Sequence, residues 1–257
     1  MRTANPALND NTFGRAMEAD YSGKSMTLEG TVNKTGILLM LIIVGAAFTW
    51  KMYMAQSPTV MIWMIGGGIG GFIVALITAF NPKGAMYTAP IYALLEGLFL
   101  GGFSAFAQTM VNEQFAQTGG TPPPIVIQAV CLTFGILLSL LFIYRLGIIK
   151  ATENFKLGVA AATGGIFMIY MLSIVMGLFG INIPFIHEGG MLGIGFSLFV
   201  IVIASLNLVL DFDFIENGAE SGAPKYMEWY GAFGLVVTLV WLYIEILRLL
   251  MKLNSRR

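Results

Sequence analysis

The segment "LGVAAATGGIFMIYMLSIVMGLFGINIPFI", residues 157–186, contains no charged side chain. A soluble fold would need polar faces over such a length, whereas a helix that crosses a bilayer needs about 20 mostly apolar residues. A second window without charge covers residues 114–144. Hydrophobic residues make up 57% of the chain and charged residues 11%, against about 25% charged residues in a typical soluble domain. The sequence therefore predicts a protein embedded in a lipid bilayer.

Seven apolar stretches are long enough to span the bilayer, and segments rich in turn residues, such as "NPKG" and "TGGTPPP", separate them. We expect an all-α polytopic domain over residues 35–251, after an amino-terminal segment (1–34) and before a short basic tail (252–257). Glycine pairs four residues apart, such as Gly66/Gly70 and Gly67/Gly71, predict close packing of helices. The expected spans are 35–54, 59–80, 86–109, 124–145, 157–180, 191–214 and 229–251.

Lysine and arginine predict the orientation, because they are enriched in cytoplasmic loops. The loops on one side hold only Lys51, whereas the amino-terminal side holds nine: Arg2, Arg15, Lys24, Lys34, Lys83, Arg145, Lys150, Lys156 and Lys225. We therefore expect a cytoplasmic amino terminus. The tail is basic as well and would lie outside if the last segment spans. Either the early loops decide the orientation, or the last segment enters the bilayer and returns.

The composition excludes several classes of function. The net charge is zero, which gives no basis for a nucleic-acid partner. The hydrolase motifs GxSxG and HExxH do not occur in the sequence, so we expect no enzymatic activity and no prosthetic group. His187, the single histidine, is placed in the loop before the sixth span and is a candidate pH sensor.

One carboxylate stands in the middle of the third apolar stretch, in "YALLEGLFLGG" (residues 92–102). Glu96 is the eleventh residue of that expected span and so lies near the middle of the bilayer, where a charge is expensive. We expect it to face the interior of the helix bundle. It is either part of an ion pathway or a neutral acid hydrogen-bonded to a neighbouring helix.

Two aspartates lie at the end of the sixth span, in "NLVLDFDFIENG" (residues 207–218). Asp211 continues a stripe of small and polar residues, since residues four and seven apart share a helix face. Asp213 lies two positions further and points elsewhere. Asp211 is therefore the better candidate for an interior ligand, and Asp213 is a candidate for the membrane interface. The other members of the stripe are Ser197, Ala204 and Asn207.

A third acid, Glu245, lies in "VWLYIEILRLL" (residues 240–250), with Arg248 one turn later. The two form either a local ion pair near the membrane surface or part of a pathway with the other acids. Buried carboxylates that approach one another share protons, and carboxylate oxygens are ligands that hard cations such as Ca²⁺ prefer. Acids on three separate helices therefore favour a cation or proton pathway.

The segments "YTAPIYALLEGLFLGG", "LNLVLDFDFIENG" and "LVWLYIEILRLL" resemble corresponding segments of the Bax inhibitor family. "MRTANPALNDNTF" and "TVNKTGILLM" are similar to the amino-terminal region of its bacterial YccA-like branch. The resemblance covers nearly the whole chain. It implies seven helices with the last one central, a bacterial inner membrane, and a pH-sensitive calcium leak gated by acids on helices six and seven. It also implies the membrane protease FtsH as a partner.

Within this resemblance, Asp211 matches the helix-six aspartate, Glu245 the helix-seven acid, and Glu96 the helix-three glutamate. The chain departs from the family pattern because the helix-seven acid is glutamate rather than aspartate, and because the interval between the two acids is longer. Either the seventh helix begins later than its apolar stretch, or this chain lacks the pair and Asp213 or Glu228 is the partner of Asp211.

The leading hypothesis is a pH-sensitive leak channel for cations, calcium in particular, gated by protonation of buried acids. Asp211 and Glu245 would bind Ca²⁺ only transiently, without a cofactor. The alternative is a non-conducting interaction protein of the bilayer that modulates an FtsH-like membrane protease or a stress response.

Overall fold

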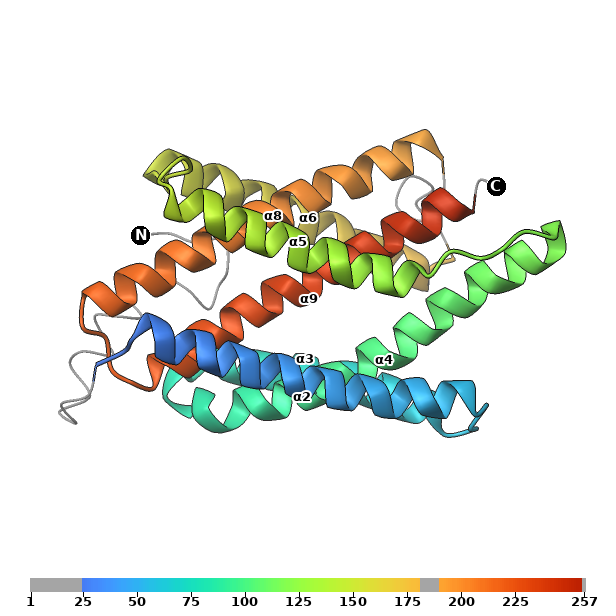
Figure 1. Ribbon diagram of the computed structural model, residues 1–257, viewed down its shortest axis with the longest axis horizontal. Helices are drawn as coiled ribbons and strands as arrows, with labels where there is room; N and C mark the ends of the chain where they lie inside the picture. Colours follow the sequence, from blue (N-terminus) through green and yellow to red (C-terminus); the bar gives the residue numbers. More distant parts are fainter. Residues whose placement is uncertain (1–24, 181–189, 256–257) are drawn as a thin grey trace. The chain divides into compact units, whose positions relative to one another are not determined.

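A computed structural model describes residues 25–180 and 190–255, and seven long α-helices form most of this part of the chain (Figure 1). All seven are long and apolar enough to cross a membrane, which confirms the predicted all-α class and the number of spans. A short 3₁₀ turn, η1 (Pro82–Gly84), lies between the second and third. The helices are α2 (Leu28–Met54), α3 (Val60–Phe80), α4 (Ala85–Thr118), α5 (Ile125–Arg145), α6 (Glu153–Leu178), α8 (Met191–Glu220) and α9 (Met227–Asn254).

The helix ends follow local sequence signals. Thr27 caps α2, because its side-chain oxygen accepts a hydrogen bond from the Gly30 amide at 3.0 Å. Thr152 caps α6 in the same way and accepts from the Phe155 amide at 3.3 Å. Gly222 follows α8 with a φ of +70°, a left-handed conformation that glycine adopts without strain and that turns the chain toward α9.

Several helices extend beyond their apolar stretches. α2 begins at Leu28 rather than at residue 35, and α4 continues to Thr118 rather than ending near residue 109. α9 begins at Met227, so the late start considered for the seventh helix does not occur. It is one continuous helix of 28 residues, about 42 Å long at 1.5 Å per residue. Such a helix excludes a last segment that enters the bilayer and returns.

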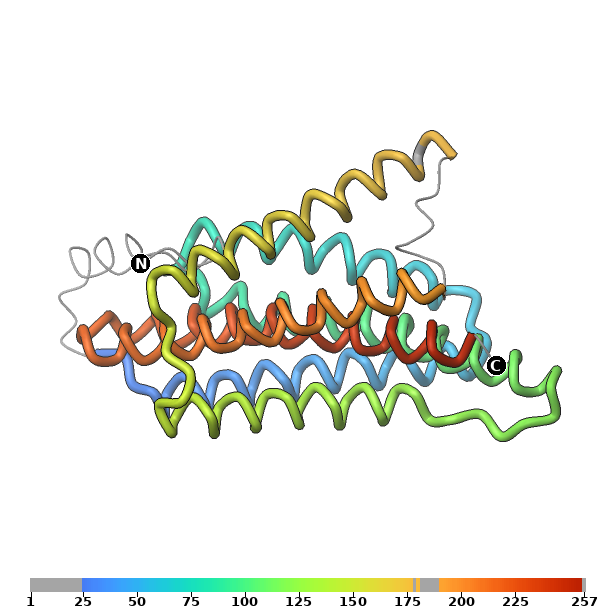
Figure 2. Tube along the Cα trace, turned by 90° about the horizontal axis from the view of Figure 1, so that it is seen from above, coloured from blue at the N-terminus to red at the C-terminus, as the bar shows by residue number. Residues whose placement is uncertain are grey.

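The described chain forms two compact units. The amino-terminal unit contains residues 25–106 and 211–237, and the carboxy-terminal unit contains residues 107–180, 190–210 and 238–255. Three helices (α4, α8 and α9) contribute a segment to each unit. In the amino-terminal unit, α2, α3 and the first part of α4 run in alternating directions (Figure 1). In the carboxy-terminal unit, α5, α6 and the first part of α8 alternate as well (Figure 2).

Close backbone packing positions α4 in the amino-terminal unit. A Cβ added to Gly45 of α2 would lie 2.6 Å from the carbonyl oxygen of Leu94, and one added to Gly67 of α3 would lie 2.6 Å from that of Leu95. Only glycine at these positions lets α2 and α3 contact the α4 backbone directly. The predicted small-residue packing is therefore confirmed at Gly67, whereas nothing in the described chain lies within 4 Å of a Cβ at Gly66.

An apolar cluster between α6 and α8 forms part of the core of the carboxy-terminal unit. Ile166 of α6 packs with Val200 and Ile203 of α8, and the larger side chains of Tyr170 and Trp241 cover this cluster. Trp241 lies on α9, which is the most buried of the seven helices: 67% of its apolar window is buried, against 50% for the region of α4, the next most buried. This burial agrees with the central last helix that the resemblance implies.

Candidate functional site

The predicted candidate acids differ in how deeply their side chains are buried. Asp211 and Glu245 are each 1% exposed, Glu228 is 0% exposed and Glu96 is 9% exposed, whereas Asp213 is only partly buried. A carboxylate inside a membrane protein is expensive unless it faces the protein interior, and such residues mark functional sites. The remaining candidate, His187, lies outside the described residues.

The polar stripe on α8 faces the protein interior, as the helix periodicity predicted. Ser197, Ala204 and Asn207 are buried together with Asp211. The Asn207 side-chain amide donates to the Thr163 hydroxyl of α6 at 2.8 Å and to the Ile203 carbonyl at 2.9 Å. Asp211 is buried and Asp213 is half-buried, a difference in the predicted direction, and the roles of the two aspartates stay predictions.

Glu96 faces the protein interior in the amino-terminal unit, as expected, and its carboxyl group points toward α3. A Cβ added to Gly71 would lie 3.0 Å from Glu96 Oε2, so the glycine leaves room for the acid. Among the described residues, no side-chain hydrogen bond of Glu96 is found. The hydrogen-bonded acid considered for this position is therefore not seen, and the carboxyl group remains a candidate for an ion or proton pathway.

Glu245 is held by two side chains of the carboxy-terminal unit. The Tyr170 hydroxyl of α6 donates to Glu245 Oε2 at 2.8 Å, and Arg248 Nη1 lies 3.6 Å from the same oxygen. The Arg248 guanidinium group also lies 5.4 Å from the centre of the Tyr170 ring, in a cation–π contact. The predicted local pair of Glu245 and Arg248 is present. Tyr170 was not predicted, and its only sequence signal is a tyrosine inside an apolar stretch.

Lys252 lies on the same side of α9 as Glu245, which is seven residues earlier. It is unusually buried for a lysine, at 8% exposed. Its ammonium group donates to the Ser197 hydroxyl at 2.9 Å and to the Gly193 carbonyl at 3.1 Å, both on α8. The sequence placed Lys252 in the basic tail after the last span. The structure instead makes it part of the packed interior, because α9 continues to Asn254.

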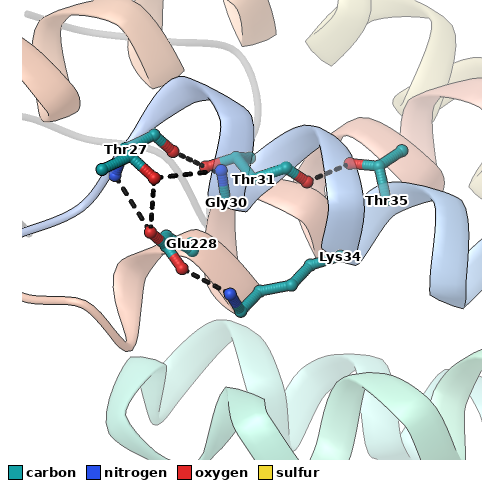
Figure 3. A network of polar contacts seen from close by, with 6 residues as sticks. All are labelled: Thr27, Gly30, Thr31, Lys34, Thr35 and Glu228. Atoms are coloured by element: carbon teal, nitrogen blue, oxygen red, sulfur yellow. Dashed lines mark hydrogen bonds and ion pairs between the residues drawn. The ribbon is translucent and has the colours of Figure 1, made fainter.

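Glu228 lies at the start of α9 and joins it to the start of α2 (Figure 3). Its Oε1 accepts from the Thr27 amide at 3.0 Å and from the Thr27 hydroxyl at 2.9 Å, and its Oε2 pairs with the Lys34 ammonium group. A side chain at Gly30 would collide with this carboxylate. We call Thr27, Gly30, Lys34 and Glu228 the Glu228 clasp.

Backbone and aromatic contacts reinforce the Glu228 clasp within the amino-terminal unit. The Met26 amide donates to the Ala223 carbonyl at 2.6 Å, and the residue before it forms a β-bridge with Pro224. The Lys34 ammonium group lies 5.5 Å from the centre of the Trp229 ring. The contacts of Glu228 are thus with α2. They favour a structural role for Glu228, in which it joins the starts of α2 and α9, over pairing with Asp211.

The acids are dispersed rather than gathered in one ligand cage. Over residues 25–180 and 190–255, no group of three or more His, Cys, Asp or Glu side chains is placed to hold a metal ion. Ca²⁺ takes six to eight oxygen ligands when it is held tightly in a protein. The described part of the chain therefore offers an entering cation one or two carboxylates at a time.

Comparison with known proteins identifies the family of this chain. No curated protein and no solved structure is significantly similar to the chain. The model of one family, described as Bax inhibitor 1 like, matches residues 5–255 and so covers all seven helices and every buried acid described above. This multi-pass membrane protein therefore belongs to the Bax inhibitor 1-like family.

Proposed function

We propose that this protein is a pH-sensitive cation leak channel, with calcium as its principal ion, gated by protonation of buried acids. One observation carries the proposal: Glu96, Asp211 and Glu245 are buried on three different membrane-spanning helices. Ionisable side chains in such positions are rare because they are expensive, and they typically mark ion pathways or proton relays. We propose further that the protein has no enzymatic activity and no cofactor.

The gate acts through the charge of the acids on α8 and α9. Tyr170 donates a hydrogen bond to Glu245 Oε2, and the Arg248 guanidinium group lies beside the same oxygen. Protonation of Asp211 or Glu245 changes the attraction of each acid for its surroundings and shifts an equilibrium between closed and open states. Calcium passes with transient coordination, since residues 25–180 and 190–255 contain no group of three or more acids placed to hold a metal ion.

The proposed location is the inner membrane of a bacterium, with the amino terminus in the cytoplasm and membership of the YccA-like branch. The distribution of lysine and arginine over the loops supports this orientation. With α9 as a seventh span, this orientation puts the carboxy-terminal end of α9 on the outer side, and the early loops decide the orientation.

The test of this function is calcium uptake by liposomes that contain the purified protein and enclose a calcium dye. We expect a flux that varies between about pH 5 and pH 8, where buried carboxylates titrate. Asp211→Asn keeps the size of the side chain but cannot ionise, so it should flatten this dependence. Asp213→Asn is the matched control and should leave it intact. A pH response lost in the control and kept in Asp211→Asn would contradict the assignment.

A non-conducting interaction protein is the second candidate, and one observation favours it. Glu245 already has a hydrogen-bond donor and a cation as neighbours, an arrangement that also suits a purely structural acid. Flux equal to that of protein-free liposomes at every pH would support this candidate. Co-purification with an FtsH-like membrane protease would then identify the partner.

A further inference from the structure

One face of α9 carries a carboxylate followed by two cations. Glu245, Arg248 and Lys252 are spaced by three and four residues, so their side chains share that face. All three lie in the carboxy-terminal unit, against Tyr170 of α6 and Ser197 of α8. The acid that the proposed function assigns to the gate is therefore the first member of a charged row.

This row is positive, because one negative and two positive charges leave a net charge of +1 at neutral pH. Within the described chain, Lys252 is in contact with a hydroxyl and a carbonyl oxygen but with no carboxylate. The carbonyl belongs to Gly193, in the first turn of α8. The amino-terminal end of a helix carries a partial positive charge, so the helix end does not compensate the lysine.

The burial of Lys252 indicates a role for its charge. Removing an ammonium group from water is costly, and well-packed neutral side chains of similar size are often at least as stable in such positions. Arg248 is 44% exposed, yet its guanidinium group lies beside Glu245 and over the Tyr170 ring. Lys252 is almost fully buried. The Arg248 charge thus lies beside the carboxylate, and the Lys252 charge lies about two turns further along the same face of α9.

We propose that Arg248 and Lys252 form a built-in electrostatic barrier that limits the passage of cations past Glu245. This inference rests on the proposed function and adds its regulation. A row with a net positive charge repels a cation that approaches the acid, and it repels a divalent ion twice as strongly as a monovalent one. The interior, where the effective dielectric constant is about 20 rather than 80, strengthens this repulsion. The barrier therefore keeps the calcium leak slow.

The experiment compares ion fluxes of variants in liposomes. Arg248→Gln and Lys252→Gln each remove one positive charge, and the double variant changes the net charge of the row from +1 to −1. We expect the double variant to conduct calcium at least about tenfold faster than the unmodified protein, equivalent to about 1.4 kcal/mol. Sodium flux should rise less. Each single variant should show an intermediate increase.

Two controls separate charge from packing. Arg248→Lys keeps the charge and should raise the calcium flux less than Arg248→Gln does. Arg145→Gln removes an exposed cation elsewhere in the same unit and should change nothing. If the Lys252 variants do not fold, as judged by thermal unfolding, Arg248→Gln alone decides, because the Arg248 side chain is 44% exposed and its loss should disturb packing less.

The possible outcomes separate this inference from the proposed function. An unmodified protein that leaks calcium together with a double variant that leaks no faster overturns the barrier and leaves the channel standing. A silent unmodified protein and a conducting double variant support the barrier, since it then closes the path completely. If neither conducts, or if the substitutions reduce the calcium flux, the barrier is overturned.

Discussion

Glu228→Gln is the sharpest test of how the amino-terminal unit is held together. Glutamine keeps one oxygen for the two Thr27 hydrogen bonds, but its NH₂ group then faces the Lys34 ammonium group, where it cannot accept a hydrogen bond. The lysine, 16% exposed, is then left without its counter-charge. Removing one partner of a buried ion pair typically costs about 3–5 kcal/mol. We expect about 3 kcal/mol here, because Lys34 keeps some contact with solvent and with the Trp229 ring.

The reverse change, Lys34→Met, should cost more than Glu228→Gln. It leaves a carboxylate with no exposed surface and only the Thr27 donors as partners. The double variant Lys34→Met/Glu228→Gln removes both charges and should cost much less than the sum of the two single changes. The difference is the coupling free energy, which we expect to be about 2–3 kcal/mol for groups in one network.

The free energy of unfolding of purified protein, measured by titrating mixed micelles with a denaturing detergent, gives all three values. Glu113→Gln serves as the control, since Glu113 is exposed on α4 and should change the free energy of unfolding by less than about 0.5 kcal/mol. A coupling free energy below about 0.5 kcal/mol would show that the Glu228 clasp does not hold the two helices together.

Three further predictions concern packing, the gate and orientation. Gly45→Ala should lower the free energy of unfolding by about 1–3 kcal/mol, because the added Cβ would meet the α4 backbone. Gly36→Ala is the control: its Cβ has open space, so the change should be neutral or stabilising. Equal effects of the two substitutions would contradict the close packing of α2 on α4. Tyr170→Phe keeps the ring but removes the hydrogen bond to the buried Glu245 carboxylate. The free energy of unfolding should fall by about 1.5–3 kcal/mol. An unchanged free energy of unfolding would mean that this bond contributes nothing to stability. With Cys131 replaced, Lys150→Cys should react with a membrane-impermeant thiol reagent only from the cytoplasmic side; reaction from outside alone would reverse the topology.

Hydropathy was sufficient to predict all seven helices, because a bilayer requires long apolar stretches and leaves few alternatives to the helix. It was insufficient for the helix ends. α4 continues through residues 110–118, a segment of mixed polarity, and α2 begins at its threonine cap inside the segment expected to precede the membrane domain. Outside the lipid, helices end where caps and turn residues end them, and apolar character no longer marks the boundary.

The candidate site was predictable only as far as helix periodicity reaches. The 3.6-residue repeat correctly predicted that Asp211 is buried more deeply than Asp213. It says nothing about which side chains of distant helices meet. Tyr170 and Glu245 are 75 residues apart, and Lys34 and Glu228 are 194 residues apart. Such pairs depend on how the helices pack, and a single sequence specifies that packing only weakly.

The long separation within the Glu228 clasp has a consequence for biosynthesis. Ribosomes add about 5–20 residues per second, so Lys34 is made roughly 10–40 s before the glutamate that neutralises it. During that interval α2 has near its start an ammonium group without its counter-charge and a Thr27 amide without its acceptor. These groups obtain their partner only when α9 has been made and inserted. Closure of the Glu228 clasp therefore distinguishes a chain whose seventh helix is in place from a nascent one.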